Sequence, residues 1–83
     1  MNTCPVCGYK ELKRPAYEVN GAGSDQICPC CRFQFGLSDF PYEERDRLMT
    51  QWRERWIQNG CEWSSHSKPP ENWNPQVQLD DLK

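Results

Sequence analysis

The sequence is poor in the residues that enzymes and nucleic-acid-binding proteins commonly use. It has a single histidine, His66, and 10 Lys and Arg residues against 12 Asp and Glu residues, for a net charge of −2. This acidic balance argues against a general phosphate-binding surface. The one candidate catalytic pair, Cys61 with His66, has no third group to orient the base. We therefore predict no catalytic residue and no enzyme activity.

Long apolar runs and a leader pattern are also missing. No segment is long and apolar enough to span a membrane, so we expect no membrane partner. Met1 to Thr3 lead directly into Cys4 without the pattern of a signal peptide, which favours the cytoplasm. In that reducing compartment, paired cysteines are more often metal ligands than disulfides. A disulfide framework of the six cysteines is the alternative.

What the sequence does contain is a repeated pair of cysteines. Cys4-Pro5-Val6-Cys7 returns after twenty residues as Cys28-Pro29-Cys30-Cys31, and an aromatic residue stands two positions after each pair. Such units fold as tight turns, here called the first knuckle (4–9) and the second knuckle (28–33). Two facing knuckles form a tetrahedral four-thiolate metal site. The predicted ligands are Cys4, Cys7, Cys28 and Cys31.

The second knuckle offers a third thiol, so its register needs an argument. Cys28 with Cys31 repeats the spacing of the first knuckle, whereas Cys28 with Cys30 would leave one residue in the turn, which is too tight. Cys30 is thus predicted to be a small apolar filler, with a spare exchangeable thiol as the alternative. Gly8 can take the left-handed conformation that the turn needs, and Arg32 at the matching position is less comfortable there.

Four thiolates indicate one structural zinc ion, because a closed shell leaves no open position for substrate or water. Iron fits the same geometry and is the less favoured metal. With 83 residues and a modest apolar fraction, the chain forms one domain, 1–83, whose core burial alone is marginal. Metal binding would then supply much of the folding free energy.

We expect a small α+β metal-stabilised domain in three parts. Residues 1–36 form the zinc-ribbon half, with rubredoxin-like knuckles and a short sheet of two or three antiparallel strands. Residues 38–59 form one amphipathic helix. Residues 61–83 form an irregular Trp-rich tail that wraps the domain and carries a short terminal helix.

The helix has recognisable ends and an apolar stripe. Ser38 and Asp39 are candidate N-caps, and Gly60 is a candidate stop. Glu43 and Arg47 are spaced for an exposed ion pair. The stripe is predicted to pack onto the ribbon, with a partner-binding groove as the alternative. It consists of Leu48, Met49, Trp52 and Trp56.

The tail carries its own signals. Asn74-Pro75 predicts the start of the terminal helix. Trp63 and Trp73 bracket a loop of polar and proline residues, and a disordered tail would not normally carry two tryptophans. We expect both to anchor the tail on the domain. An exposed aromatic patch for a partner is the alternative.

The two cysteine pairs resemble known families. Ile27-Cys28-Pro29-Cys30-Cys31, preceded by Cys4-Pro5-Val6-Cys7-Gly8-Tyr9, resembles the bacterial cysteine-rich CPCC domain, a group of small, mostly uncharacterised zinc-ribbon-like proteins. This resemblance implies a fold and a metal. The same knuckles are similar to those of rubredoxins, which would imply one iron and electron transfer. Arg32 in place of the usual glycine, the long helix and the Trp-rich tail depart from the rubredoxin plan.

Three functions follow from these observations. The favoured one is a zinc-stabilised protein-interaction or regulatory module whose partner is another protein; the sequence specifies neither the partner nor the number of chains in the assembly. A rubredoxin-like electron carrier is the second. A nucleic-acid-binding zinc ribbon is the third, and it is disfavoured because Lys10, Lys13 and Arg14 are the only basic cluster of the ribbon.

Overall fold

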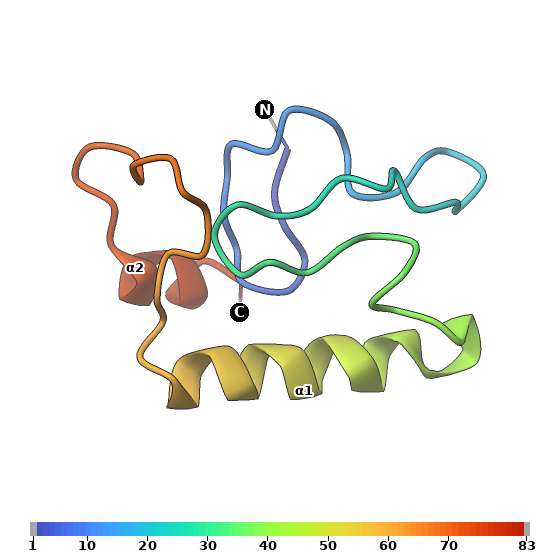
Figure 1. Cartoon of the computed structure of the whole chain (residues 1–83). Helices are drawn as coiled ribbons and strands as arrows, with labels where there is room; N and C mark the ends of the chain where they lie inside the picture. Colours follow the sequence, from blue (N-terminus) through green and yellow to red (C-terminus); the bar gives the residue numbers. More distant parts are fainter. Residues whose placement is uncertain (1, 83) are drawn as a thin grey trace.

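The computed structural model describes residues 2–82 and contains three helical elements. They are the 3-10 helix η1 (Tyr42–Glu44), the α-helix α1 (Arg45–Gln58) and the α-helix α2 (Pro75–Asp80). Figure 1 shows the loops of the N-terminal half lying above α1, with α2 beside them at one end of the molecule. None of the helices within 2–82 is long and apolar enough to cross a membrane.

The expected antiparallel sheet is wrong for the described part of the chain. Only isolated antiparallel bridges form there, and each ends at the next turn. One reason is that Asp25, which lies between the bridged residues Gly23 and Ile27, is left-handed with a φ of 65° and interrupts the extended backbone that a ladder needs. The bridges pair Asn2 with Leu12, Tyr17 with Gly23, and Ile27 with Gln34.

The predicted helix is confirmed, but it starts later than expected. Its α-helical part begins at Arg45, after η1, and neither start has a side-chain cap. The expectation that Ser38 or Asp39 caps the helix is therefore wrong. Asp39 is instead completely buried and accepts hydrogen bonds from the Gly36 N–H, at 3.1 Å, and from the Tyr17 hydroxyl. The Asp39 carboxylate thus joins the loop before the helix to Tyr17.

The end of α1 is a Schellman motif built on Gly60. This glycine has a φ of 94°, and its N–H donates to the Ile57 carbonyl at 3.0 Å. The N–H of Cys61 donates to the Trp56 carbonyl at 2.9 Å. Both bonds satisfy carbonyls that the last turn of a helix leaves without partners. The chain therefore leaves α1 sharply and turns back toward the knuckles.

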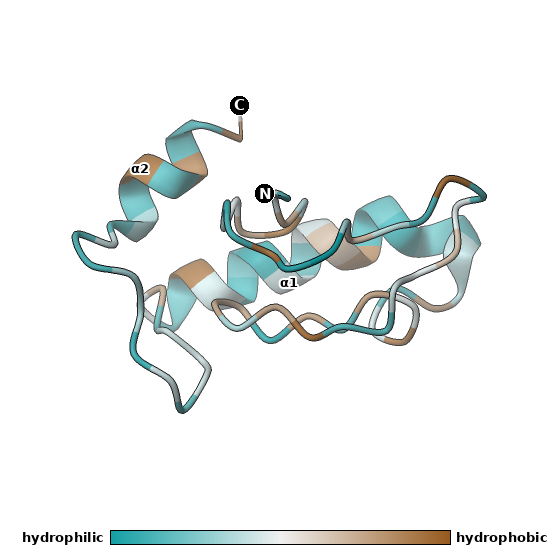
Figure 2. Ribbon diagram, turned by 90° about the horizontal axis from the view of Figure 1, so that it is seen from above, coloured by the Kyte–Doolittle hydropathy of each residue, from teal (hydrophilic) through white to brown (hydrophobic). Residues whose placement is uncertain are grey.

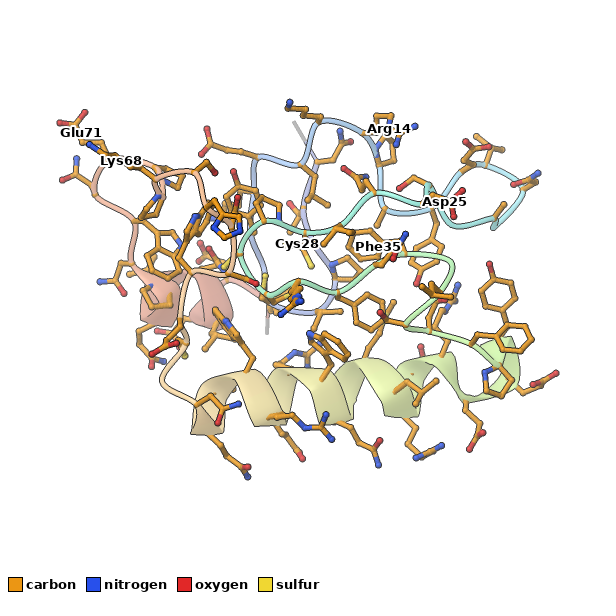
Figure 3. The ribbon with its side chains drawn as sticks, viewed as in Figure 1. Arg14, Asp25, Cys28, Phe35, Lys68 and Glu71 are labelled. Atoms are coloured by element: carbon orange, nitrogen blue, oxygen red, sulfur yellow. The ribbon has the colours of Figure 1, made fainter. Side chains whose placement is uncertain are left out.

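The apolar stripe of α1 packs onto the loops above it. Met49 and Trp56 are buried, and Trp52 meets Phe33 edge to face at 5.4 Å between ring centroids. Phe33 and Phe35 are both completely buried. Figure 3 shows Phe35 and Cys28 within the layer of loops that lies above α1, and Figure 2 shows the apolar bands of α1 on a largely hydrophilic helix. The stripe thus serves the core of the chain itself.

The ion pair expected on the exposed side of α1 has a different partner. Arg47 pairs with Glu44, at 2.5 Å and a spacing of i,i+3, rather than with Glu43. Both spacings bring side chains together on a helix. Because Tyr42–Glu44 is a tighter 3-10 turn, it changes which glutamate faces Arg47.

The tail returns to the first knuckle. Asn74 caps α2 by accepting hydrogen bonds from the N–H groups of Gln76 and Val77 at 2.9 and 3.3 Å. Trp63 meets both Tyr9 and Trp73 edge to face, each at 5.4 Å between centroids. These three aromatic rings hold the tail against the knuckle that Tyr9 ends.

Candidate metal centre

The two knuckles have the same backbone hydrogen bonds. The N–H of Gly8 donates to the Cys4 carbonyl at 2.9 Å, and the N–H of Arg32 donates to the Cys28 carbonyl at 2.8 Å. The fourth residue after each leading cysteine is also left-handed, with φ of 88° at Gly8 and 75° at Arg32. Arginine therefore accepts the conformation for which glycine is the natural choice.

The knuckles bring four sulfurs together. The Sγ atoms of Cys4, Cys7, Cys28 and Cys31 all lie within 4.8 Å of one another. Cys4 and Cys31 are 3.9 Å apart at their sulfurs, and Cys7 and Cys28 are 3.7 Å apart. Four sulfurs bound at about 2.3 Å from a central zinc ion form a tetrahedron with edges of about 3.8 Å. The donor set therefore fits a tetrahedral metal ion, and this cluster could hold one.

The cluster is closed to solvent and unoxidised. Three of its cysteines are completely buried, and Cys31 is 4% exposed. All six cysteines of the chain are free thiols. The measured separations are far longer than the bond of about 2.0 Å that joins two sulfurs in a disulfide. The structure therefore has the reduced thiols that a metal site needs rather than a disulfide framework.

Hydrogen bonds among the thiols of the cluster shift the pKa values of Cys7, Cys28 and Cys31 in opposite directions. Hydrogen bonds from neighbouring thiols, that of Cys31 foremost, lower the pKa of Cys28. The pKa values of Cys7 and Cys31 are raised, chiefly because each donates a hydrogen bond to Cys28. A metal ion would replace these shared protons, since the thiolate is the ligand.

Helix α1 supports both knuckles from below. The indole N–H of Trp52 donates to the Cys31 carbonyl at 2.9 Å. The guanidinium of Arg53 donates from Nε to the Val6 carbonyl at 2.5 Å and from Nη2 to the Pro5 carbonyl at 2.9 Å. Arg53 thus turns toward the knuckles, unlike Arg47 on the exposed side of the same helix. The position of Arg53 four residues after Met49 placed it beside the buried stripe.

Helix α2 closes the site from the other side through Gln78, which the sequence did not single out. This residue is 7% exposed, and its amide nitrogen donates to the Cys7 carbonyl at 2.9 Å and to the Cys30 sulfur at 3.3 Å. Its amide oxygen accepts from the Trp73 indole at 3.0 Å. No local pattern could have revealed this role, because the partners lie 71 and 48 residues away in the chain.

The remaining candidate residues lie outside the four-thiol cluster. Cys30 is completely buried next to Gln78, which suits the small filler expected there. Cys61 is half-buried, and burial raises the pKa of its thiol. Within residues 2–82 no hydrogen bond joins Cys61 to His66. His66 instead lines a surface cavity with residues of the second knuckle.

Comparison with known proteins places the chain in a family. It is 32% identical to YozI of Bacillus subtilis (strain 168), described as an uncharacterized protein, over 86% of this chain and 69% of YozI. It is also 30% identical to the uncharacterized protein YoaQ of the same strain, over 70% of this chain and 58% of YoaQ. No family model matches, and no solved structure matches. The chain belongs to the family of YozI.

Proposed function

We propose that this member of the YozI family is a small zinc-binding protein whose single Zn²⁺ is structural. The ligands would be Cys4, Cys7, Cys28 and Cys31. The observation that carries the proposal is the cluster of four buried thiols with edges of 3.7 and 3.9 Å, which suit a tetrahedral ion. The same residues support assignment to the CPCC domain family. The need for reduced thiols supports a cytoplasmic location.

The burial of the site favours zinc over the rubredoxin-like iron alternative. An electron carrier needs a metal whose edge lies close to solvent, so that electrons reach a partner. Here the ligands are between 0% and 4% exposed, α1 holds both knuckles, and α2 covers the first. Tetrahedral thiolate geometry itself suits either metal. The shielding is what a structural ion would have.

The chemistry of a closed site supports a binding role rather than catalysis. Four thiolates would leave the ion no open position for water or substrate, so it would clamp the loops in place. We propose that the surface held by this clamp acts as a protein-interaction or regulatory module. The nucleic-acid alternative loses support because Lys10 is paired with Asp81, and Arg14 donates to the Ser24 carbonyl at 3.1 Å. Two members of the basic cluster of the N-terminal half are thus already engaged.

Metal analysis of matched cysteine variants tests the site. We expect one zinc per chain in the wild type, loss of the metal in Cys28→Ser, and one zinc per chain in Cys30→Ser. The reason is that Cys28 belongs to the four-thiol cluster and Cys30 does not. Elemental analysis of the purified proteins measures the ratio.

Two outcomes would contradict the assignment. Equal metal loss from Cys28→Ser and Cys30→Ser would overturn the ligand set. A red protein that contains iron and bleaches on reduction would replace the structural zinc with the electron-carrier alternative.

A further inference from the structure

We propose that the outer side of the second knuckle carries a docking groove for an acidic peptide segment of a partner protein. Arg32 and Arg55 would bind its carboxylates, and exposed parts of the neighbouring tryptophans would contact its apolar side chains. This inference rests on the proposed interaction role and names the surface and the chemistry of the partner. Its first support is a difference between the two knuckles.

The two knuckles differ in what covers them. At Gly8 a Cβ atom would lie 2.5 Å from the Gln78 carbonyl oxygen, so the tail leaves no room there for any side chain. The matching position in the second knuckle holds Arg32, which is exposed. The tail thus fills the space above position 8 of the first knuckle and leaves the side chain at position 32 of the second knuckle exposed. An interaction surface next to the candidate metal centre can therefore include position 32 but not position 8.

The second knuckle needs a left-handed residue at position 32, but no contact of the Arg32 side chain explains why that residue is an arginine. Its φ of 75° is left-handed, which disfavours every residue with a Cβ atom. Among residues 2–82 its guanidinium makes no hydrogen bond and no ion pair. Non-glycine residues held in this region are concentrated at functional sites. Arg32 is therefore better explained by what it can bind than by what it holds together.

A second arginine with the same property lines the same cavity. This cavity of about 500 Å³ lies between the second knuckle, the C-terminal half of α1 and the start of the tail. Arg55 of α1 is exposed, and its guanidinium, like that of Arg32, makes no hydrogen bond or ion pair with any residue that the structure describes. Trp52, Trp56 and Trp63 also line the cavity. The indole N–H groups of all three already donate to backbone carbonyls. Trp52 and Trp63, which are half-buried, therefore offer apolar surface, and the arginines offer the free donors.

The shape favours an extended ligand over a simple anion. A second cavity of about 490 Å³ adjoins the first and shares Arg32 and Ser64 with it. Its wall includes the loop that follows α1, where Ser64 and Ser65 donate backbone hydrogen bonds to the carbonyls of Cys30 and Pro29 at 3.1 and 2.9 Å. Figure 1 shows this part of the tail beside the second knuckle. The two cavities together suit a short stretch of chain.

The charge of the groove selects carboxylates on a peptide. Arginine binds a carboxylate through two parallel hydrogen bonds, and an apolar neighbour in the ligand would contact the indoles. A nucleic acid needs a track of cations along its backbone. The first cavity has only two arginines, against the carboxylate of Glu62, on a chain of net charge −2. A peptide with spaced acidic and apolar side chains is the better match.

Calorimetric titration of the zinc-loaded chain with a short acetylated peptide amide that alternates glutamate with leucine and phenylalanine tests the proposal. Arg32→Gly and Arg55→Ala should each weaken binding about tenfold, in line with the loss of a charge-assisted pair. Arg32→Gly suits this test because glycine favours the left-handed backbone, so the variant folds. Arg47→Ala is the matched control: it removes the same charge from α1 outside the groove and should bind like the wild type. Glu62→Gln should bind more tightly.

The other arms separate the explanations. The same peptide with glutamine for every glutamate, inorganic phosphate and oligothymidine should all bind at least tenfold more weakly. The groove assignment is overturned if the acidic peptide fails to bind the zinc-loaded wild type, if Arg32→Gly binds it equally, or if oligothymidine competes. Zinc content measured on the same samples keeps the two proposals apart. A chain without metal refutes the proposed function, whereas a loaded chain that ignores the peptide refutes only the groove.

Discussion

At positions 8 and 32 the two knuckles need the same left-handed backbone, yet the chain has glycine at one and arginine at the other. The hydrogen bonds that the N–H groups of these two residues donate are 2.9 and 2.8 Å long, so the turn itself tolerates either residue. What differs is the neighbour, because the Gln78 carbonyl lies over Gly8. The glycine is thus required by the packing of the tail as well as by the turn.

Alanine at two left-handed glycines separates these causes. Gly21 has a φ of 89° and nothing within 4 Å of an added Cβ, so Gly21→Ala should cost only about 1 kcal/mol of backbone strain. Gly8→Ala, at a φ of 88°, adds an overlap with the Gln78 carbonyl and should cost about 2 kcal/mol more. Chemical denaturation of the zinc-loaded proteins measures both. Equal losses would show that α2 does not press on the first knuckle.

At the scale of elements, α1 acts as a support that joins the two halves of the metal site. Trp52 bonds to the second knuckle and Arg53 to the first, from neighbouring positions on one helix. The Schellman end at Gly60 then directs the tail back toward the same site. The geometry of the thiols therefore depends on a helix that contributes no ligand.

Removal of Arg53 should loosen this support. We expect Arg53→Ala to lower the free energy of unfolding by about 2 kcal/mol, because the carbonyls of Val6 and Pro5 lose a charged donor. Arg47→Ala, on the exposed side of the same helix, should change it by less than about 0.5 kcal/mol. Denaturant midpoints of the two variants provide the comparison. Similar small effects would mean that Arg53 does not hold the knuckle.

Helix α2 is the second supporting element; it places Leu79 in the core and donates the buried Gln78 amide to the first knuckle. Gln78→Ala should leave the Cys7 carbonyl without its side-chain donor, cost about 2 kcal/mol of tail docking, and speed zinc transfer to a chelator. Gln76→Ala, which loses only an exposed contact with Asp80, is the matched control. Hydrogen exchange of the α2 amides and the chelation rate report the two effects. Unchanged exchange in Gln78→Ala would show that the Gln78 amide does not hold the tail on the first knuckle.

For the whole molecule, the four-thiol cluster and the hydrophobic core are one structure. The four thiols of the cluster belong to the same buried cluster as Phe33, Met49 and Trp56. A core this small supplies only a few kcal/mol, whereas structural zinc supplies about 10–16 kcal/mol in small zinc domains. The free energy lost with the metal should therefore exceed the free energy of unfolding of the folded chain.

Removal of zinc should unfold the chain. With excess chelator we expect the helical signal in far-ultraviolet circular dichroism and the dispersion of the amide NMR spectrum to be lost together, and to return on addition of zinc. The reduced protein must be used throughout, so that disulfides do not replace the metal. A chelated chain that keeps its native spectrum would refute the structural role.

Some of this structure could be predicted because it depends on local spacing. The spacing of each cysteine pair is typical of a metal-binding knuckle, and a glycine such as Gly60 after a helical pattern is a common helix end. The periodic stripe with Met49 and Trp56 placed α1 on the core. The prediction of a sheet was wrong because the alternation of apolar and polar residues in such short segments does not distinguish an isolated bridge from a ladder. The prediction that Asp39 caps the helix was wrong because a carboxylate that precedes a helix can instead accept a hydrogen bond from a distant hydroxyl, here that of Tyr17.

The sequence by itself determined which thiols can form one site, since their spacing is a local property of two turns. It also determined where α1 ends and where α2 begins, because caps act within a few residues. Only the tertiary structure decided that Arg53 and Gln78 hold the knuckles, and that the tail covers one knuckle and leaves Arg32 exposed on the other. These contacts join residues about fifty or more positions apart, and no local pattern specifies them, because they depend on how the whole chain closes around its thiols.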